Sequence, residues 1–222
     1  MDDPNENAGA MAWLHVDSHL VVVDKPAGLL SVPGRGPGKQ DCACARVQRR
    51  FPEALTVHRL DLATSGLLVM ARGPRMQRAL SSLFEQRQVS KRYVAMVAGL
   101  LEPPAAADGW GRIDLPLAAD WPNRPRQTID RERGRPSRTR WRVLSWDPAL
   151  DATRVELEPV TGRSHQLRVH LQAIGHPILG DALYAPGAVQ RLAPRLLLHA
   201  SQLGLTHPAS GKPMHWRSEP PF

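Results

Sequence analysis

Cysteine is scarce in this sequence, and its scarcity excludes two kinds of stabilising site. The chain contains only two, Cys42 and Cys44. One residue apart, they are too close for an ordinary disulfide and have no second pair with which to form a zinc site. Residues 1–10 are acidic and polar, unlike a signal peptide, and no apolar run reaches the length of a bilayer crossing. We therefore expect reduced thiols without a structural role, in a cytoplasmic protein that binds no membrane.

Lysine is also scarce, although the chain is strongly basic. Lys and Arg total 29 against 21 Asp and Glu, which gives a net charge of +8, and only four of the cations are lysines. An excess of arginine favours a polyanionic partner, because a guanidinium pairs with phosphate through two parallel hydrogen bonds and stacks on bases. Composition alone also allows a basic protein with no such partner.

Length and periodicity predict one large α+β domain. The 222 residues suffice to bury a core without crosslinks. Short alternating runs predict more strands than helices, so we expect a mixed, mainly antiparallel sheet with flanking helices and loops around a central cleft. We expect residues 1–11 to be a disordered leader and residues 12–222 to be the functional domain.

Local patterns predict the positions of the main elements. A hairpin is predicted over Trp13–Val16 and Leu20–Val23, and later strands at 91–99, 137–145, 153–158, 196–199 and 203–206. Three helices are predicted: one capped by Asp41 and ending at Arg50, one beginning at Pro74 with Met76, Leu80, Leu83 and Phe84 on its buried face, and one capped by Ser164 and ended by Gly175. The Pro- and Ala-rich residues 100–109 should form a surface loop.

The stretch 57–69 (VHRLDLATSGLLV) carries the first chemical signal. Arg59 and Asp61 are two apart in an apolar run, so on an extended backbone both side chains lie on one face and Leu60 points to the other. The turn-forming residues 64–66 should then separate two strands. A carboxylate beside a guanidinium stays ionised and can act as a nucleophile or base, although a structural ion pair at a strand end has the same pattern.

Residues 121–142 are the most basic segment of the chain. They contain eight arginines and two carboxylates, with Trp121 and Trp141 among them. Within the predicted strand, Arg138, Arg140 and Arg142 should share one face. Clustered arginines and aromatic rings favour a surface that binds RNA or DNA, although charges on a strand can also protect the edge of a sheet.

Three blocks of the sequence together resemble the RluA family of pseudouridine synthases. They are DKPAGLL at 24–30, HRLDLATSG at 58–66 and GRSHQLRVH at 162–170. The resemblance runs from about Trp13 to the C-terminus, and DWPNRP, HPILGD and PRLLLHA, at 120–125, 176–181 and 194–200, resemble the short founding type of the family. The insertion at 100–109 departs from that pattern. We also expect no accessory RNA-binding domain before the catalytic domain.

The resemblance implies an isomerase that converts uridine to pseudouridine in stem-loops of large-subunit (23S) ribosomal RNA and of the transfer RNA anticodon loop. It implies Asp61 as the catalytic aspartate, with Arg59 entering the space left by the flipped nucleotide or holding its phosphate. It also implies that Tyr93 stacks on the uracil and that Arg168 pairs with Asp61. The residues that we expect to contact RNA are His58, Arg124, Arg126, Arg163, His165 and Gln166. No cofactor and no metal are implied, and we expect a monomer.

Three alternatives compete with this interpretation. A metal site could use His165, His170 and His176, or His58 with Asp61. His165 and His170 are five residues apart, however, and so lie on different faces of a helix, unlike the four-residue spacing of a zinc helix. A non-catalytic RNA-binding protein needs the basic surface but has no use for a buried Arg/Asp pair. A nuclease would cut the strand and would usually need a divalent metal.

Overall fold

The computed structural model describes residues 11–222. All but the last residue of the predicted leader therefore lies outside the described residues. The chain forms two compact units: the described part of Met1–Lys91 together with Ala200–Pro221, and Arg92–His199 together with Phe222. A single domain over residues 12–222 stays a prediction.

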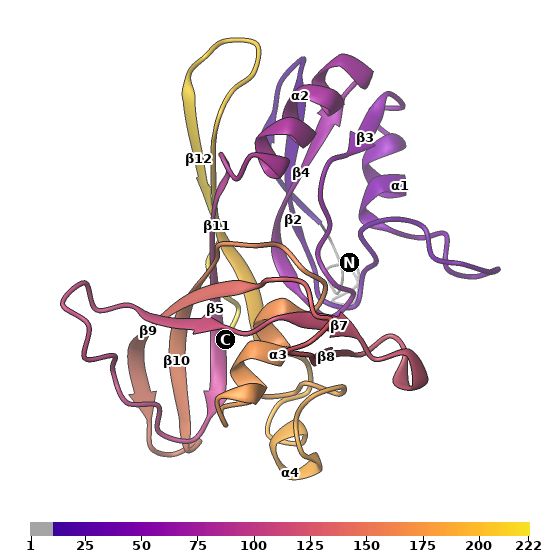
Figure 1. Cartoon of the computed structure of the whole chain (residues 1–222). Coiled ribbons are helices and arrows are strands. Elements are labelled where there is room, and N and C mark those ends of the chain that lie inside the picture. The colour runs from indigo at the N-terminus through magenta and orange to yellow at the C-terminus, as the bar shows by residue number, and fades with distance from the viewer. Residues whose placement is uncertain (1–10) are drawn as a thin grey trace, which may run out of the picture. The chain divides into compact units, whose positions relative to one another are not determined.

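The first unit is a sheet with two helices (Figure 1). Its strands follow the order β1-β2-β4-β11, with β12 paired to β11 and β3 paired to β4. The bounds are β1 Ala12–Val16, β2 Leu20–Lys25, α1 Ala43–Gln48, β3 Ala54–Thr56, β4 Ser65–Arg72, α2 Pro74–Glu85, β11 Leu198–Thr206 and β12 Pro213–Arg217. The strand pairs β1–β2, β2–β4, β3–β4 and β11–β12 are antiparallel.

Helix α2 covers part of β4 and closes the core of this unit. It begins at Pro74 as predicted, because proline fits the first helical position, where no intrahelical partner exists for an N–H. Met76 and Leu80 are buried and pack with Leu67 and Val69 of β4. The predicted apolar face of this helix is therefore confirmed.

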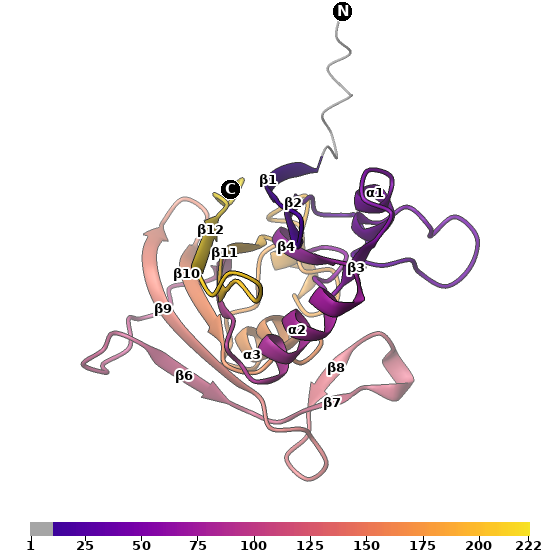
Figure 2. The same cartoon turned by 90° about the horizontal axis from the view of Figure 1, so that it is seen from above.

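The second unit has strand order β5-β10-β9-β6 and a separate hairpin, β7–β8. Figure 2 shows β6, β9 and β10 side by side. The bounds are β5 Ser90–Ala98, β6 Gly111–Asp114, β7 Leu117–Ala119, the 3-10 turn η1 Trp121–Asn123, β8 Gln127–Ile129, β9 Arg138–Asp147, β10 Ala152–Pro159, α3 Gln166–Ala173 and α4 Gly187–Gln190. The pairs β5–β10, β9–β10, β6–β9 and β7–β8 are antiparallel, which confirms an α+β fold with a mainly antiparallel sheet.

Two local predictions were wrong. Helix α1 is capped by Cys42, whose Sγ accepts the N–H of Ala45 at 3.3 Å, while Asp41 instead pairs with Arg46. The thiol of Cys42 therefore has a structural role. The two short strands predicted near the C-terminus are one continuous strand, β11, and the partner that pairs with it is the unpredicted β12.

Candidate active site

Arg59 and Asp61 lie on a loop, not on the predicted strand. β3 ends at Thr56 and β4 begins at Ser65, so residues 57–64 have no regular structure. Arg59 is exposed, Leu60 is 4% exposed and Asp61 is half-buried. The side chains therefore alternate as predicted, although the backbone forms no sheet. The chain reverses just after the aspartate, where the N–H of Thr64 donates to the carbonyl oxygen of Asp61 at 3.1 Å.

The predicted turn at residues 64–66 was misplaced, because Ser65 and Gly66 already belong to β4. Gly66 has a φ of +112°, and a Cβ there would lie 2.4 Å from the carbonyl oxygen of Ala200 on β11. Glycine is needed at this position for the close approach of two backbones, in addition to its positive φ.

The loop that follows β2 supports the Asp61 loop. The hydroxyl of Ser31 donates to the carbonyl of Leu60 at 2.8 Å and accepts the N–H of Leu60 at 3.0 Å. The N–H of Gly28 donates to the carbonyl of Leu62 at 2.9 Å. These bonds fix the backbone on both sides of Asp61, so the loop that follows β2 holds the loop that carries Asp61 in place.

Lys25 strengthens the same support from the interior. Its side chain is 0% exposed, and its ammonium donates to the carbonyls of Pro26 and Leu29 at 2.9 and 2.8 Å and to that of Leu62 at 3.4 Å. A buried ammonium is tolerated only where acceptors replace its water shell. Sequence reasoning placed Lys25 in a motif but did not anticipate that it joins two loops.

Tyr93 lies on β5 in the second unit. The predicted strand over residues 91–99 is confirmed to within one residue at each end. Tyr93 is half-buried and faces Leu157 of β10 in the strand register. The strand that carries it is anchored by the buried run Val94–Val97. Its stacking on uracil stays a prediction.

Helix α3 carries Arg168, and its start differs from the prediction. The N-cap residue is His165 in the left-handed conformation, with a φ of 53° and no side-chain cap bond, so Ser164 does not cap the helix. The end is as predicted. Gly175, with a φ of +87°, donates its N–H to Gln172, and the next residue donates to Leu171, which is a Schellman motif.

Arg168 forms a buried ion pair with Asp181. Its Nε and Nη2 donate to the two carboxylate oxygens at 2.7 and 2.6 Å, and the side chains are only 5% and 1% exposed. Sequence reasoning missed Asp181 as a site residue, although the block HPILGD contained it. The bidentate contact uses two of the five N–H donors of a guanidinium, so it does not prevent Arg168 from also pairing with Asp61. That pairing stays a prediction.

Tyr184 joins several predicted site residues of the second unit. The Arg168 guanidinium carbon lies 4.9 Å from the centre of its ring, and that of Arg126 lies 5.4 Å away. Its hydroxyl accepts the N–H of Gln127 at 2.8 Å and lies 2.6 Å from Nδ1 of His165. Tyr184 is 3% exposed, so this network is formed inside the protein.

The structure gives Gln166 a role other than the predicted contact with RNA. The residue is 3% exposed. Its Oε1 accepts from the hydroxyl of Thr161 and the N–H of Arg163, and its Nε2 donates to the carbonyl of Arg138 and to Oγ1 of Thr139. With both ends of the amide engaged inside the protein, Gln166 holds the start of α3, and its contact with RNA stays a prediction.

His58 is held against helix α2. Its ring stacks on Phe84 with the ring centres 4.5 Å apart, and its Nε2 accepts the N–H of Val69 at 3.0 Å. Burial lowers the pKa of His58 to about 3, and the charge of Lys91 adds to the effect. The ring is therefore neutral at physiological pH, and its predicted contact with RNA stays untested.

Arg124 and Trp121 form an exposed stack on the turn between β7 and β8. The guanidinium carbon lies 3.2 Å from the centre of the indole ring, and Trp121 is 68% exposed. The side-chain amide of Asn123 donates to both carboxylate oxygens of Asp120, at 3.1 and 3.0 Å. These two hydrogen bonds hold the turn. A base could stack here without rearrangement of the turn.

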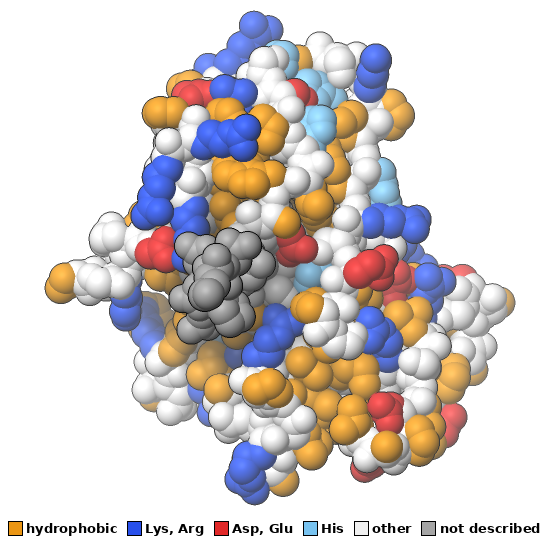
Figure 3. All heavy atoms as spheres, turned by 180° about the vertical axis from the view of Figure 1, so that it is seen from behind, with side chains coloured by type: hydrophobic (Ala, Val, Ile, Leu, Met, Phe, Trp, Pro, Cys, Tyr) orange, Lys and Arg blue, Asp and Glu red, His pale blue; other side chains and the backbone are white. Residues whose placement is uncertain are grey.

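The arginines of β9 were predicted to face RNA, and their ion pairs favour the structural alternative. Arg138 pairs with Asp114, Arg140 with Asp108 and Glu158, and Arg142 with Glu156. Figure 3 shows that Lys and Arg side chains on the face it presents are spread out, with Asp and Glu side chains between them. Ion pairs between strands and loops therefore neutralise much of the positive charge of this segment.

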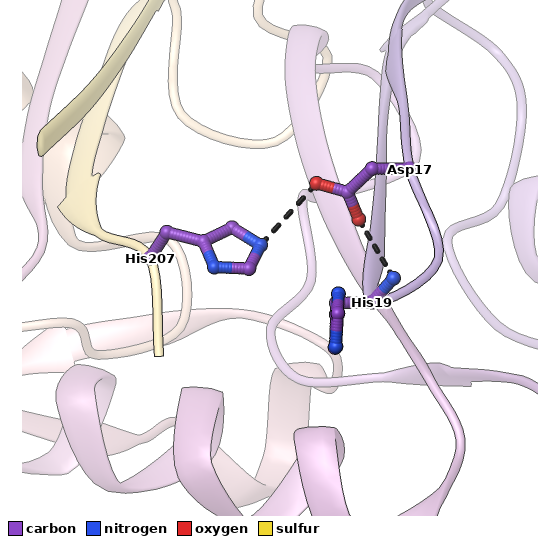
Figure 4. Close-up of side chains that lie close together, drawn as sticks. All are labelled: Asp17, His19 and His207. Atoms are coloured by element: carbon purple, nitrogen blue, oxygen red, sulfur yellow. Dashed lines mark hydrogen bonds and ion pairs between the residues drawn. The ribbon is translucent and has the colours of Figure 1, made fainter. Parts of the chain in front are cut away.

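Among residues 11–222, one group of side chains has the spacing of metal ligands: Asp17, His19 and His207 (Figure 4). The carboxylate of Asp17 also bonds to His15 at 2.9 Å and lies 3.2 Å from Nε2 of His207. Nδ1 of His207 accepts two backbone N–H groups, which leaves the proton of the neutral ring on Nε2. A metal would need that nitrogen unprotonated, and the structure instead places it 3.2 Å from the Asp17 carboxylate, where it forms a contact between two hairpins.

The histidines of the metal alternative make separate contacts. His165 bonds to Tyr184, His170 bonds to Oγ1 of Thr139 and to a backbone carbonyl, and His176 bonds to the carbonyl of Ala98. Burial lowers the pKa of His170. No candidate ligand group within the described part of the chain includes any of these three histidines.

Comparison with known proteins shows the family to which the chain belongs. The family model described as RNA pseudouridylate synthase matches residues 19–173. The chain belongs to this family. The dual-specificity RNA pseudouridine synthase RluA of Yersinia pestis is 50% identical over 212 residues, which cover 96% of this chain and all of the relative. The enzyme of the same name from Escherichia coli K12 is 48% identical over 98% of both chains.

A solved structure agrees with this assignment. The human RNA pseudouridylate synthase domain containing 1 has a TM-score of 0.77 and 25% identity, and the match covers all of this chain and 87% of the human one. The protein is thus an RNA pseudouridine synthase, an isomerase of the RluA type, and not a non-catalytic RNA-binding protein. None of the helices in residues 11–222 is both long and apolar enough to cross a membrane.

Proposed function

We propose that this synthase isomerises single uridines in stem-loops of both large-subunit ribosomal RNA and transfer RNA, acting as a monomer in the cytoplasm. The observation that carries the proposal is the 50% identity, over the full length of the relative, to an enzyme named for dual specificity. Unpaired loop bases suit such an enzyme, because a base that is already unstacked costs least to flip out.

Asp61 is the residue that acts on the flipped nucleotide in this proposal. During the reaction the bond from N1 of uracil to C1′ of ribose breaks and a bond from C5 to C1′ forms, with a proton lost at C5 and one gained at N1. A carboxylate can assist as nucleophile or base if it is ionised and held in place. The hydrogen bonds of Ser31 and Gly28 to Leu60 and Leu62 support the second condition.

The other residues bind and orient in this scheme. Arg59, which is exposed, occupies the space that the nucleotide leaves or holds its phosphate. Tyr93 confines the detached uracil by stacking while the ring turns, and Arg168 pairs with Asp61 and orients its carboxylate. Arg124, Arg126, Arg163 and His165 contact the RNA.

The test is single-turnover reaction of two synthetic hairpins, one from each RNA, with pseudouridine detected by mass spectrometry of the nucleosides. Both hairpins should react at one loop uridine. Asp61→Asn should lower the rate by more than about a thousandfold. Asp41→Asn, which breaks the exposed pair with Arg46, is the matched control and should leave the rate unchanged.

The outcomes separate the parts of the proposal. Reaction only with assembled ribosomal particles would exclude the stem-loop substrate. Reaction of one hairpin alone would exclude dual specificity. An active Asp61→Asn enzyme would remove Asp61 from the chemistry.

A further inference from the structure

The carboxylate of Asp181 is held on every side by N–H donors. Oδ2 accepts from Nε of Arg168 at 2.7 Å, and Oδ1 accepts from its Nη2 at 2.6 Å. Oδ1 also accepts the backbone N–H groups of Leu183 and Tyr184 at 2.9 and 3.1 Å. The two backbone bonds fix the carboxylate, and the carboxylate in turn fixes the plane of the guanidinium.

The ring of Tyr184 fixes the guanidinium in the remaining direction. It lies 4.9 Å from the guanidinium carbon of Arg168, and its hydroxyl is anchored by the N–H of Gln127 at 2.8 Å. A planar cation held in its plane by a bidentate carboxylate and across its face by a ring has little freedom to turn.

This arrangement is a poor way to stabilise a fold. Two charges that are 5% and 1% exposed lose their hydration, and apolar residues of similar volume would often serve stability as well or better. The loop is also conformationally constrained. Gly180 has a φ of +71°, and a Cβ there would lie 1.9 Å from the carbonyl oxygen of Arg195. What the Arg168–Asp181 pair provides instead is a fixed direction for the Arg168 guanidinium.

We propose that Asp181 is a positioning residue of this synthase, which sets the direction of the Arg168 guanidinium and acts on turnover through it. The inference rests on the proposed function, in which Arg168 serves Asp61. A carboxylate that engages two of the five guanidinium donors permits Arg168 to meet a second anion at the same time.

The first experiment compares Asp181→Asn with the wild type under multiple-turnover conditions at saturating hairpin, at a temperature where circular dichroism shows both fully folded. An amide cannot accept the bidentate bond, so kcat should fall about 10- to 100-fold, as for other residues that orient a functional group, while the Kd for the hairpin stays unchanged. Glu156→Gln is the control. It breaks another ion pair of the same unit, in which the carboxylate is 8% exposed, and should lower Tm without lowering kcat.

A double variant distinguishes positioning from a purely structural effect. If Asp181 acts only through Arg168, then Arg168→Met combined with Asp181→Leu should be no slower than Arg168→Met alone. The same double variant should be more stable than either single variant, because no buried charge is left unpaired. Asp181→Glu replaces Asp181→Asn if the latter does not fold, and should lower kcat because the added methylene shifts the carboxylate.

Wild-type kcat in a folded Asp181→Asn or Asp181→Glu enzyme would overturn the inference, and so would fully additive losses in the double variant. If Arg168→Met itself kept wild-type kcat, the proposed role of Arg168 would be wrong. An inactive Arg168→Met beside an active Asp181→Asn would remove only the positioning role.

Discussion

Two arginines of the second unit stack on aromatic rings in opposite surroundings. Arg124 lies on Trp121, which is 68% exposed, and Arg124 forms no ion pair within residues 11–222. Arg168 lies on Tyr184, and these two are 4% and 3% exposed, with Asp181 bound to the guanidinium. The exposed stack can meet a base or phosphate, whereas the buried one can only hold its own cation. We therefore expect the same pair of side-chain types to serve RNA binding in one place and orientation in the other.

The largest effect should come from removing the aromatic ring of the buried stack, which is that of Tyr184. Tyr184→Ala removes a ring that is 3% exposed and packs with Leu117 and Val169. The free energy of unfolding should fall by about 3–5 kcal/mol, as for other buried aromatic residues cut to alanine. Urea unfolding followed by circular dichroism measures the change. A loss below about 1 kcal/mol would show that the ring is dispensable for packing, and the contrast with Trp121 would disappear.

Removing the aromatic ring of the exposed stack, which is that of Trp121, should instead lower the affinity for RNA. Trp121→Ala should weaken hairpin binding by about 1–3 kcal/mol, the usual worth of a base stacked on an aromatic side chain, with kcat unchanged. Fluorescence anisotropy with a labelled hairpin measures the Kd. Arg124→Gln is the companion variant and should also flatten the dependence of log K on log salt by roughly 0.7 to 0.9, the value for one phosphate contact.

Trp146→Ala is the matched control, because this tryptophan lies on β9 and is 36% exposed. It should bind RNA as the wild type does. Equal losses in both tryptophan variants would mean that RNA binding is not localised at the turn.

The third stack is that of His58 on Phe84, where burial lowers the pKa of the histidine ring. Substituting His58 should give the smallest effect of the three. The pKa of His58 is about 3 in the fold and near its ordinary 6.5 in the unfolded chain. Unfolding then takes up a proton, so the stabilising contribution is complete above pH 6.5 and is lost progressively as the pH falls toward 3. His58→Gln keeps an acceptor for the N–H of Val69 and should reduce the slope of unfolding free energy against pH by up to one proton between pH 4.5 and 6.5.

His215→Gln is the control for this measurement, because His215 is exposed on β12. An unchanged slope in His58→Gln would show that His58 titrates normally in the fold.

Much of the fold followed from the sequence because its periodic segments carry their own signal. The hairpin at Trp13–Val23, helix α2 from Pro74 and the end of α3 at Gly175 were all predicted from residues within each element. The caps of α1 and α3 were each wrong by one residue, whereas the wrong predictions around the Asp61 loop depended on partners distant in the sequence. Gly66 is needed for Ala200, and the Asp61 loop takes its shape from Ser31 rather than from strand pairing.

The candidate site divides in the same way. Arg59, Asp61, Tyr93 and Arg168 were predicted from the resemblance to the RluA family, and their roles stay predictions. Asp181 and Tyr184 were missed because their contribution is visible only once the chain brings them to Arg168. Gln166 was assigned to RNA from its motif, and only its burial shows that it braces the helix.

The backbone at Gly180 also limits how this enzyme could be redesigned. A side chain at that position would collide with the carbonyl of Arg195, so the loop that presents Asp181 tolerates little variation. The turn at Trp121–Arg124 is exposed, so substitutions there disrupt far fewer packing contacts. An engineer seeking a synthase for a new RNA loop should therefore randomise the turn and leave the Gly180 loop untouched.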